Sequence, residues 1–408
     1  MRPAFWRTAT ASAAALVVTA GVALAASHYD TGATGKEIKV GNIMPYSGPA
    51  SAYGVIGRVE AAYFRKINDE GGVNGRKIDF ISYDDSYSPP KTVEQARKLV
   101  EDDQVLLIFN SLGTPTNTAI QHYMNEEKVP QLFVATGATK WNDPKQFPWT
   151  MGWQPSYQTE ANIYARYILK NKPNAKIGVL YQNDDYGKDY LKGLTDGLGS
   201  NAKSMIVSEQ SYDVSEPAID SEIVNLQASG ADVLVDITTP KFAAQSIRKA
   251  HEIGWHPLFI LNNVSASVGS VLKPAGFDAS QGIISAAYLK DATDPEWKND
   301  QDMKQWKAFM DHYAPDADKS DASTVYAYSV ARTMVHVLKA CGNDLTRANI
   351  MKQAANLKNY DPGLLLPGIE INTSPTNFAP VQQLQLIRFE GTTWKRFGPI
   401  MSGEVSGA

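Results

Sequence analysis

Two short loops rich in small residues and hydroxyl groups contain the residue types best suited to binding a ligand. The loop at 110–115 reads NSLGTP, and the loop at 135–139 reads ATGAT. Their backbone N–H and hydroxyl groups can point at a carboxylate, and helices that follow such loops add a favourable dipole. The sequence therefore predicts a site for a small anion. The candidate ligand contacts in the two loops are Leu112, Gly113, Thr114, Gly137, Ala138 and Thr139.

Aromatic side chains recur close to the predicted loops and can enclose an apolar part of the ligand. A single tyrosine at a loop is equally compatible with a surface or hinge contact, so the prediction rests on the recurrence. The residues concerned are Tyr53, Trp141, Tyr157 and Tyr186.

Residues for catalysis or metal binding do not occur in a recognisable pattern. The sequence contains no G-x-S-x-G, no G-x-G-x-x-G after a strand and no H-E-x-x-H. His251 and His256 are five residues apart and separated by Gly254-Trp255, a spacing that does not place both on one helix face. The acidic pairs Asp84-Asp85 and Asp184-Asp185 could act as general acids, or as helix caps and turn formers. We therefore expect a binding protein without catalytic activity, metal or cofactor.

The two loops must be positioned by the strands that precede them. Short apolar runs at 105–109 and 132–134 are typical of buried strands, and a helical pattern separates them. A strand, helix and strand in this order give parallel strands, whose ends share one edge of the sheet. That edge is expected to form half of a ligand cleft.

The same alternation of strands and helices occurs twice along the chain. A segment rich in proline and tryptophan, at 144–155, separates the two series. Such alternation predicts parallel sheets covered by helices. We expect an α/β protein of two Rossmann-like lobes joined by a multi-strand hinge. The expected boundaries are 37–155 with 287–362 for the first lobe, 156–286 with 363–400 for the second, 26–36 for a flexible lead and 401–408 for a tail.

The C-terminal third contains three helical patterns, at 295–312, 322–340 and 345–357, that have no counterpart in the second series. We expect them to return and cover the first lobe. Further strands are expected at 368–371 and 383–390.

The first 25 residues have the features of a secretory signal peptide. Arg2 and Arg7 are followed by an apolar run rich in small residues, and Ala23-Leu24-Ala25 matches the pattern that signal peptidase cleaves. A membrane anchor is the alternative, but the run is short and rich in alanine for a span. We expect export and cleavage near Ala25. No cysteine follows the cleavage region, which argues against a lipid anchor.

Composition excludes several further classes. The net charge is −4 and no long basic run is present, which argues against a nucleic-acid partner. Cys341 is the single cysteine, so a disulfide within the chain is impossible. Its place near the end of an apolar helical pattern predicts a small buried core residue.

The sequence resembles the branched-chain amino-acid-binding (Leu/Ile/Val-binding) family of periplasmic proteins, the solute receptors of ABC importers. The resemblance covers nearly all of 37–400 and rests on five segments taken together. These segments are KVGNIMPYSGPASAYG, INDEGGVNGRKIDFISYDD, VATGAT, YQNDDYGKDYLKGL and IRKAHEIGW. It implies the type I periplasmic-binding-protein fold, a monomer in the periplasm and ABC permease subunits in the inner membrane as partners.

The resemblance also implies roles for individual residues. The two first-lobe loops would hold the ligand carboxylate, and Tyr53 matches the aromatic residue after the first strand. Tyr186 matches a second-lobe tyrosine that packs on the ligand. Thr238 falls in the next second-lobe loop, and Asn263 takes the place of the acidic residue that receives the ligand's α-ammonium.

Three departures from the family bear on the ligand. Tyr87 and Leu112 replace the cysteines of members with a disulfide, and Gly113 replaces the usual serine of the first loop. An amide at Asn263 cannot compensate a buried ammonium group. A standard amino acid is therefore disfavoured, whereas the aromatic loops at Trp141 and Tyr157 suit an aromatic acid.

The sequence thus favours a periplasmic receptor of an ABC importer. It would bind a small carboxylate, either branched-chain amino-acid-like or aromatic, between two lobes that close on it. A sensor domain that presents an amide or amino acid to a signalling partner is the first alternative. An exported hydrolase is the second.

Overall fold

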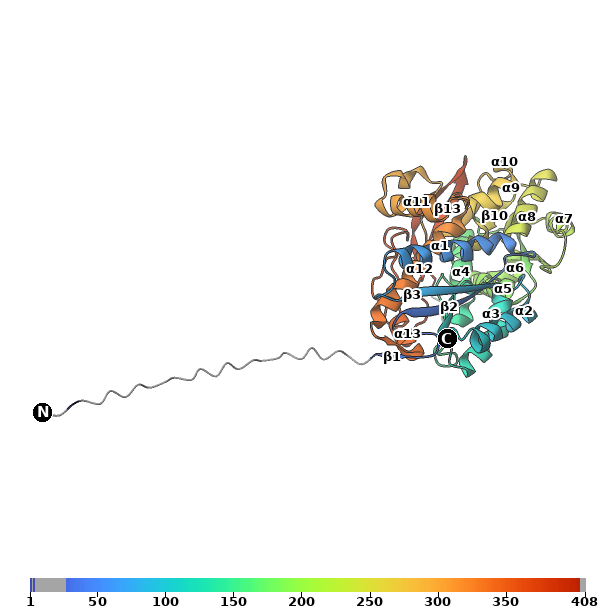
Figure 1. Cartoon of the computed structure of the whole chain (residues 1–408). Helices are drawn as coiled ribbons and strands as arrows, with labels where there is room; N and C mark the ends of the chain where they lie inside the picture. The colour runs from blue at the N-terminus through green and yellow to red at the C-terminus, as the bar shows by residue number, and fades with distance from the viewer. Residues whose placement is uncertain (2, 4–26, 404–408) are drawn as a thin grey trace.

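The structure is a computed structural model that describes residues 1, 3 and 27–403 (Figure 1). Its two main sheets form the centres of two lobes, which confirms the expected α/β class. The signal peptide expected over 1–25 lies outside the described residues, apart from residues 1 and 3. Within the described part of the chain, no helix is long and apolar enough to span a bilayer.

A five-stranded parallel sheet of order β3-β2-β4-β5-β6 forms the centre of the first lobe. All residues of β4 and β5 are buried, because both faces of the sheet are covered. Their sequences are therefore apolar without alternation. The strands are β2 (Glu37–Met44), β3 (Lys77–Asp84), β4 (Leu107–Phe109), β5 (Gln131–Val134) and β6 (Thr150–Gly152).

Helices cover this sheet on both faces, and the alternation of β4 shows how. Ile108 packs into the cluster formed with α2 and α3, whereas Leu107 and Phe109 point to the opposite face, into the cluster that contains α1 and α12. Helix α1 packs against α12 and α11, so the late helices return to the first lobe as expected. The helices are α1 (Val55–Asp69), α2 (Pro89–Arg97), α3 (Thr114–Glu126), α11 (Gln301–Tyr313), α12 (Ala322–Cys341) and α13 (Arg347–Ala354).

A seven-stranded sheet of order β14-β13-β11-β10-β9-β7-β8 forms the centre of the second lobe. Strands β7 to β11 are parallel, and β13 and β14 form an antiparallel hairpin at one edge. The strands are β7 (Ile177–Gln182), β8 (Ile206–Tyr212), β9 (Val233–Ile237), β10 (Leu258–Leu261), β11 (Ile284–Ala287), β13 (Gln383–Glu390) and β14 (Thr393–Ser402). The helices are α4 (Tyr157–Asn171), α5 (Asp185–Leu198), α6 (Ala202–Met205), α7 (Asp220–Ala228), α8 (Pro240–Glu252), α9 (Lys273–Ala275) and α10 (Phe277–Ser280).

The described chain passes between the two sheets three times. It crosses between β6 and α4, between β11 and α11, and between α13 and β13. The second and third crossings lie side by side, because Leu289 bridges to Leu365 and the N–H of Leu366 donates to the carbonyl of Tyr288 at 2.9 Å. These adjacent crossings are the structural counterpart of the expected hinge.

Local structure differs from the expectations in a few places. The segment expected as a flexible lead, 26–36, contains β1 (His28–Tyr29), which pairs with β12 (Asp344–Leu345), and Tyr29 accepts a hydrogen bond from Arg76 at 2.9 Å. No strand forms at 368–371, because a turn between Leu366 and Ile369 leaves only an isolated bridge to Tyr360.

Four strands were missed. Two of them, β1 and β12, have only two residues each and pair with one another. Strand β14 runs to Ser402 and takes up the start of the expected tail; its polar edge sequence, interrupted by Gly398-Pro399, hides the strand pattern. Strand β6 has only three residues and lies in the proline-rich segment.

Candidate ligand-binding site

A partly open cavity of ≈ 140 Å³ lies between the two lobes. Both sheets contribute the ends of their strands to its walls, and the second and third crossings close one side. Seven of the twelve candidate residues line it, namely Tyr53, Leu112, Gly113, Thr114, Tyr157, Tyr186 and Asn263. Five do not, namely Gly137, Ala138, Thr139, Trp141 and Thr238.

The first loop presents the start of helix α3 to the cavity. Gly113 is the residue before the helix, and no side chain caps the helix there. The first N–H groups of an uncapped helix need another acceptor and favour an anion. The hydroxyls of Thr114 and Thr136 lie 2.6 Å apart and tie the two loops together. The N–H of Gly113 itself already donates to the carbonyl of Ala135 at 3.3 Å.

Gly113 has a backbone that other residues adopt only with strain. Its φ is 103°, and a Cβ atom there would lie 2.5 Å from the ring of Tyr87 and 2.5 Å from Oγ1 of Thr116. The absence of a side chain therefore lets the tyrosine ring pack directly on the loop. This packing accounts for glycine at the position.

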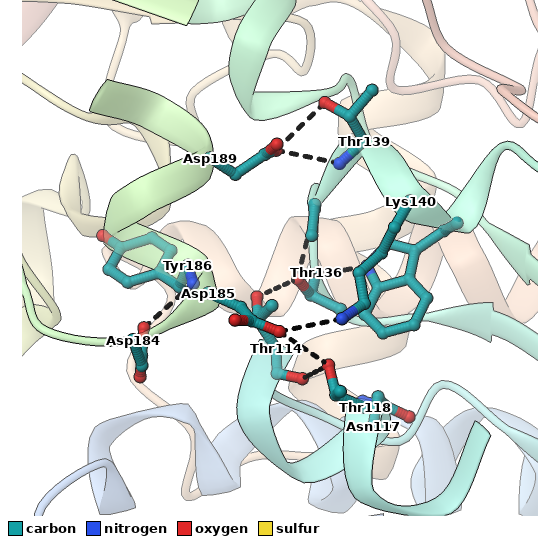
Figure 2. A network of polar contacts seen from close by, with 12 residues as sticks. Thr114, Asn117, Thr118, Thr136, Thr139, Lys140, Asp184, Asp185, Tyr186 and Asp189 are labelled. Carbon is teal, nitrogen blue, oxygen red and sulfur yellow. Dashed lines mark hydrogen bonds and ion pairs between the residues drawn. The ribbon is translucent and has the colours of Figure 1, made fainter. Parts of the chain in front are cut away.

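The second loop uses its donors within the protein. The N–H and the hydroxyl of Thr139 both donate to Oδ2 of Asp189, at 2.8 and 3.0 Å (Figure 2). The indole of Trp141 is buried and donates to Thr136 at 3.4 Å. The carbonyl of Gly137 accepts the N–H of Tyr157 at 2.7 Å, and the N–H of Ala138 donates to Thr136 at 3.3 Å.

Asp189 belongs to α5, so this contact joins the two lobes. Beside it, Nζ of Lys140 lies 2.8 Å from Oδ2 of Asp185, at the start of the same helix (Figure 2). Burial raises the pKa of Asp189, whereas the hydrogen bond from Lys140 lowers the pKa of Asp185. We call Thr139, Lys140, Asp185 and Asp189 the interlobe clasp.

Tyrosine rings form the wall on the second-lobe side. The ring of Tyr157 stacks on Tyr190, with centroids 4.4 Å apart, and meets Tyr186 edge-on at 5.3 Å. The hydroxyl of Tyr186 donates to the carbonyl of Thr238 at 3.0 Å and accepts a hydrogen bond from Asn262. Burial raises the pKa of Tyr157 to about 12, so the phenol stays neutral. The wall is therefore rigid, aromatic and uncharged.

The loop after β9 places Thr239, rather than Thr238, against the cavity. The hydroxyl of Thr238 points into the lobe and donates to Asp236 at 2.6 Å. Thr239 is the residue before α8, a second helix without a side-chain cap. Thr238, the residue expected from the sequence, lies one residue before the threonine that lines the cavity. Side chains in an extended segment alternate in direction, so neighbouring residues face opposite sides.

A buried carboxylate that the sequence did not reveal lies behind Asn263. Glu160 accepts hydrogen bonds from the N–H of Asn263 at 2.7 Å and from the hydroxyls of Tyr164 and Tyr190 at 2.8 and 2.9 Å. Burial raises its pKa to about 7. Glu160 does not line the cavity. Its position in the first turn of α4 looks like an ordinary helix-start acid in the sequence.

The first aspartate of each acidic pair at a strand end serves as a turn or cap residue. Asp84 accepts the N–H groups of Tyr46 and Ser86, each at 2.9 Å, and Asp184 accepts the N–H of Tyr186 at 2.9 Å. No group of three metal-ligating acidic, histidine or cysteine side chains occurs in the described ranges. The hydrogen bonds of Asp84 and Asp184 fit the role of helix caps and turn formers rather than that of general acids.

Several cavity residues had no signal in the sequence. They come from the end of β3, from the crossings and from α12, and they meet only in the folded chain. Examples are Tyr87, Gln154, Tyr288, Lys290, Asp291 and Tyr326.

Comparison with known proteins decides the family. The family model described as "Periplasmic binding protein" matches residues 37–393, most of the chain. The chain belongs to the periplasmic binding protein family. This family consists of solute-binding receptors, and its name implies the periplasm as the location.

Two relatives of this periplasmic binding protein come from Brucella abortus. "Leu/Ile/Val-binding protein homolog 1" is 26% identical over 330 residues, which cover 79% of this chain and 84% of the relative. "Leu/Ile/Val-binding protein homolog 7" is 26% identical over 274 residues, which cover 63% of this chain but only 65% of that relative.

Solved structures show the same fold for this periplasmic binding protein. A branched-chain amino acid ABC transporter protein from Thermus thermophilus with bound valine superposes with a TM-score of 0.81 at 15% identity, covering 90% of this chain and 97% of its own. A fatty acid ABC transporter substrate-binding protein from Thermomonospora curvata has a TM-score of 0.79 at 22% identity, covering 93% and 95%. At these identities the likeness shows the fold alone.

Proposed function

We propose that this periplasmic binding protein is the receptor of an ABC importer and binds a small carboxylate between its two lobes. The uncapped start of α3 at the cavity carries the proposal. Pro115 has no N–H group and the N–H of Gly113 is already bonded, so the N–H groups of Thr114 and Thr116, with the helix dipole, are what favour a carboxylate. The low dielectric of the cavity strengthens that contact.

The walls favour an aromatic acid over an α-amino acid. Tyr53, Tyr157 and Tyr186 offer ring surfaces, and Asn263 offers no negative charge for an α-ammonium group. The cavity of ≈ 140 Å³ is close in size to engineered cavities of about 150 Å³ that hold a benzene molecule. A branched-chain amino-acid-like ligand remains the second member of the proposed class.

The rest of the proposal concerns the working cycle. The lobes open and close about the adjacent crossings, and the closed receptor docks as a monomer on permease subunits in the inner membrane. Export through the signal peptide, with cleavage near Ala25, brings the protein to the periplasm. Closure excludes water from the cavity and thereby strengthens its few polar contacts.

A thermal-shift screen tests the proposed ligand class. Branched-chain amino acids, aromatic carboxylates and their amides are added at matched concentrations to the full chain. A binder raises the melting temperature by mass action, and we expect the carboxylates to do so and their amides to do so less. No shift with any carboxylate would overturn the proposal.

A further inference from the structure

The cavity does not end at the tyrosine wall but continues along the edge of the seven-stranded sheet. Its lining includes Thr239 after β9, Asn263 after β10, Ala287 at the end of β11, and Ile387 and Arg396 on β13 and β14. These strands are neighbours in this order. Strands β9 and β11 alone are two spacings apart, about 10 Å. The ammonium and carboxylate groups of an α-amino acid are attached to the same carbon, so they cannot lie this far apart.

Charge is distributed unevenly along the cavity. Its lining has four charged residues, Lys290, Asp291, Asp294 and Arg396, and all follow β11 or belong to β14. The start of α3 is at the other end, since the hydroxyl of Thr118 on α3 lies 3.5 Å from Asp185 at the start of α5, after β7 (Figure 2). One end of the cavity is therefore lined by uncharged residues and lies at the start of α3, and the other end carries charge.

Three of the four charged residues form a salt bridge with another residue of the protein. Nζ of Lys290 lies 2.8 Å from Asp300, Asp294 lies 3.3 Å from Nζ of Lys395, and Arg396 pairs with Glu296. Lys290 and Arg396 also lie over the ring of Trp297, at 5.4 and 4.8 Å from its centroid. These contacts give each of the three charges an oppositely charged partner within the protein, although Nε of Arg396 makes no hydrogen bond with the described residues.

Asp291 is different. Its Oδ1 accepts the N–H and the hydroxyl of Thr293, at 2.6 and 2.5 Å, and it makes no salt bridge with any residue in 27–403. Burial raises its pKa, as expected for a carboxylate without a cation nearby. The hydroxyl of Thr293 lies 3.0 Å from that of Thr393, the first residue of β14, so Asp291 is at the charged end. An unpaired carboxylate in such a place gains from a cationic partner.

We propose that Asp291 binds a cationic group of the ligand at the charged end of the cavity. This inference rests on the proposed function and narrows its ligand class. The ligand carries a carboxylate at the start of α3 and an ammonium group separated from it by an aromatic ring or an alkyl chain. The negative charge that is absent at Asn263 is thus supplied farther along the same cavity.

Asp291 also shapes a local turn, and a substitution can separate the two roles. Asparagine forms the same turn with its side-chain oxygen but lacks the charge. Asp291→Asn is therefore expected to fold with an unchanged melting temperature in the absence of ligand. Asp196→Asn is the matched control, since Asp196 lies on α5 in an exposed pair with Lys192, away from the cavity.

The experiment compares pairs of probes that differ only in the amine. para-(Aminomethyl)benzoate is paired with para-methylbenzoate, and a series of ω-aminoalkanoates is paired with alkanoates of equal length. Affinities of the full-length chain and of both variants are measured by calorimetry.

We expect at least one amine-bearing probe to bind about tenfold tighter than its partner, because a hydrogen bond between an ammonium group and a carboxylate is stronger than one between neutral groups. That advantage should disappear in Asp291→Asn and persist in Asp196→Asn. An equal affinity within every pair, or an advantage that survives Asp291→Asn, would overturn the inference and leave the carboxylate receptor intact. Binding of neither probe type would instead count against the proposed function.

Discussion

Thr139 and Asp189 connect the two lobes through two hydrogen bonds to a single carboxylate oxygen, at 2.8 and 3.0 Å. The other oxygen of Asp189 accepts from Nε2 of Gln158 at 2.6 Å, within its own lobe. A carboxylate of the protein thus occupies the donors that the sequence suggested for a ligand carboxylate. In this arrangement Thr139 holds the two lobes together and does not line the cavity.

Removal of the Asp189 carboxylate should therefore loosen the closed state. We expect Asp189→Ala to raise the radius of gyration of the ligand-free protein in small-angle X-ray scattering. Because closure is needed for every ligand, affinity should fall by a similar factor, about tenfold, for all binders. A loss confined to one ligand would indicate direct contact instead.

Two further variants calibrate this effect. Asp196→Ala, on the same helix, removes an exposed carboxylate paired with Lys192 and should leave the scattering profile unchanged. Lys140→Met removes the neighbouring ion pair, whose lysine and aspartate side chains are 34% and 51% exposed. Such exposed pairs contribute less than about 1 kcal/mol to stability, so Lys140→Met should have a smaller effect than Asp189→Ala. The contribution of the pair should decrease further as salt is added.

Glu160 makes stability depend on pH. Its pKa is about 7 in the folded protein and near 4.5 in the unfolded chain, so the folded state binds more protons between these values. The free energy of unfolding should therefore fall as pH rises from about 4.5 to about 7, by up to about 3 kcal/mol from this residue. Glu160→Gln removes the titration, and denaturant unfolding across this range should show a shallower fall.

Asp236 serves as the control for that slope, because burial also raises its pKa to about 7. Its carboxylate bonds Thr238 and Ser246, away from the Glu160 cluster. Asp236→Asn should therefore reduce the slope independently, and the two effects should add. A pH profile that is identical in Glu160→Gln and the parent protein would contradict the assignment.

Gly113 allows a test of close packing at the start of α3. Gly113→Ala places a methyl group 2.5 Å from the ring of Tyr87, in addition to straining a backbone with φ of 103°. Gly276 has nearly the same φ, 102°, but nothing lies within 4 Å of the added methyl group. We expect Gly276→Ala to cost only the backbone strain, about 1 kcal/mol, and Gly113→Ala to cost about 1–3 kcal/mol more. Equal losses in denaturant unfolding would remove the packing argument.

The sequence predicted the sheets better than the site, and particular residues show why. Continuous apolar runs such as 105–109 predict a strand buried on both faces, because the chain's own hydrophobic pattern determines that structure. The loops at strand ends follow from the same pattern, and it named Thr114 and Tyr186 as candidates, both of which line the cavity. The direction of one side chain does not follow, and Thr238 was named where Thr239 lines the cavity.

The parts of the site that the sequence did not predict depend on contacts between segments that are distant in sequence. No local pattern pairs Thr139 with a carboxylate on α5, or places Asp291 and Tyr326 in one cavity with Leu112. Such arrangements depend on how two lobes and three crossings meet in space. A short strand such as β6 is missed for a related reason, since its partner β5, rather than its own sequence, makes it a strand.

The return of α12 to cover α1 determines the order in which the lobes can be completed. Strands β7 to β11 come from one continuous stretch, 177–287, so most of the second sheet can assemble as soon as that stretch exists. The first lobe begins earlier in the chain but lacks the helix that buries the apolar side of α1 until residue 341 has been made. The first lobe therefore lacks the cover of α1 until most of the second sheet has been made, and the second sheet in turn receives β13 and β14 last.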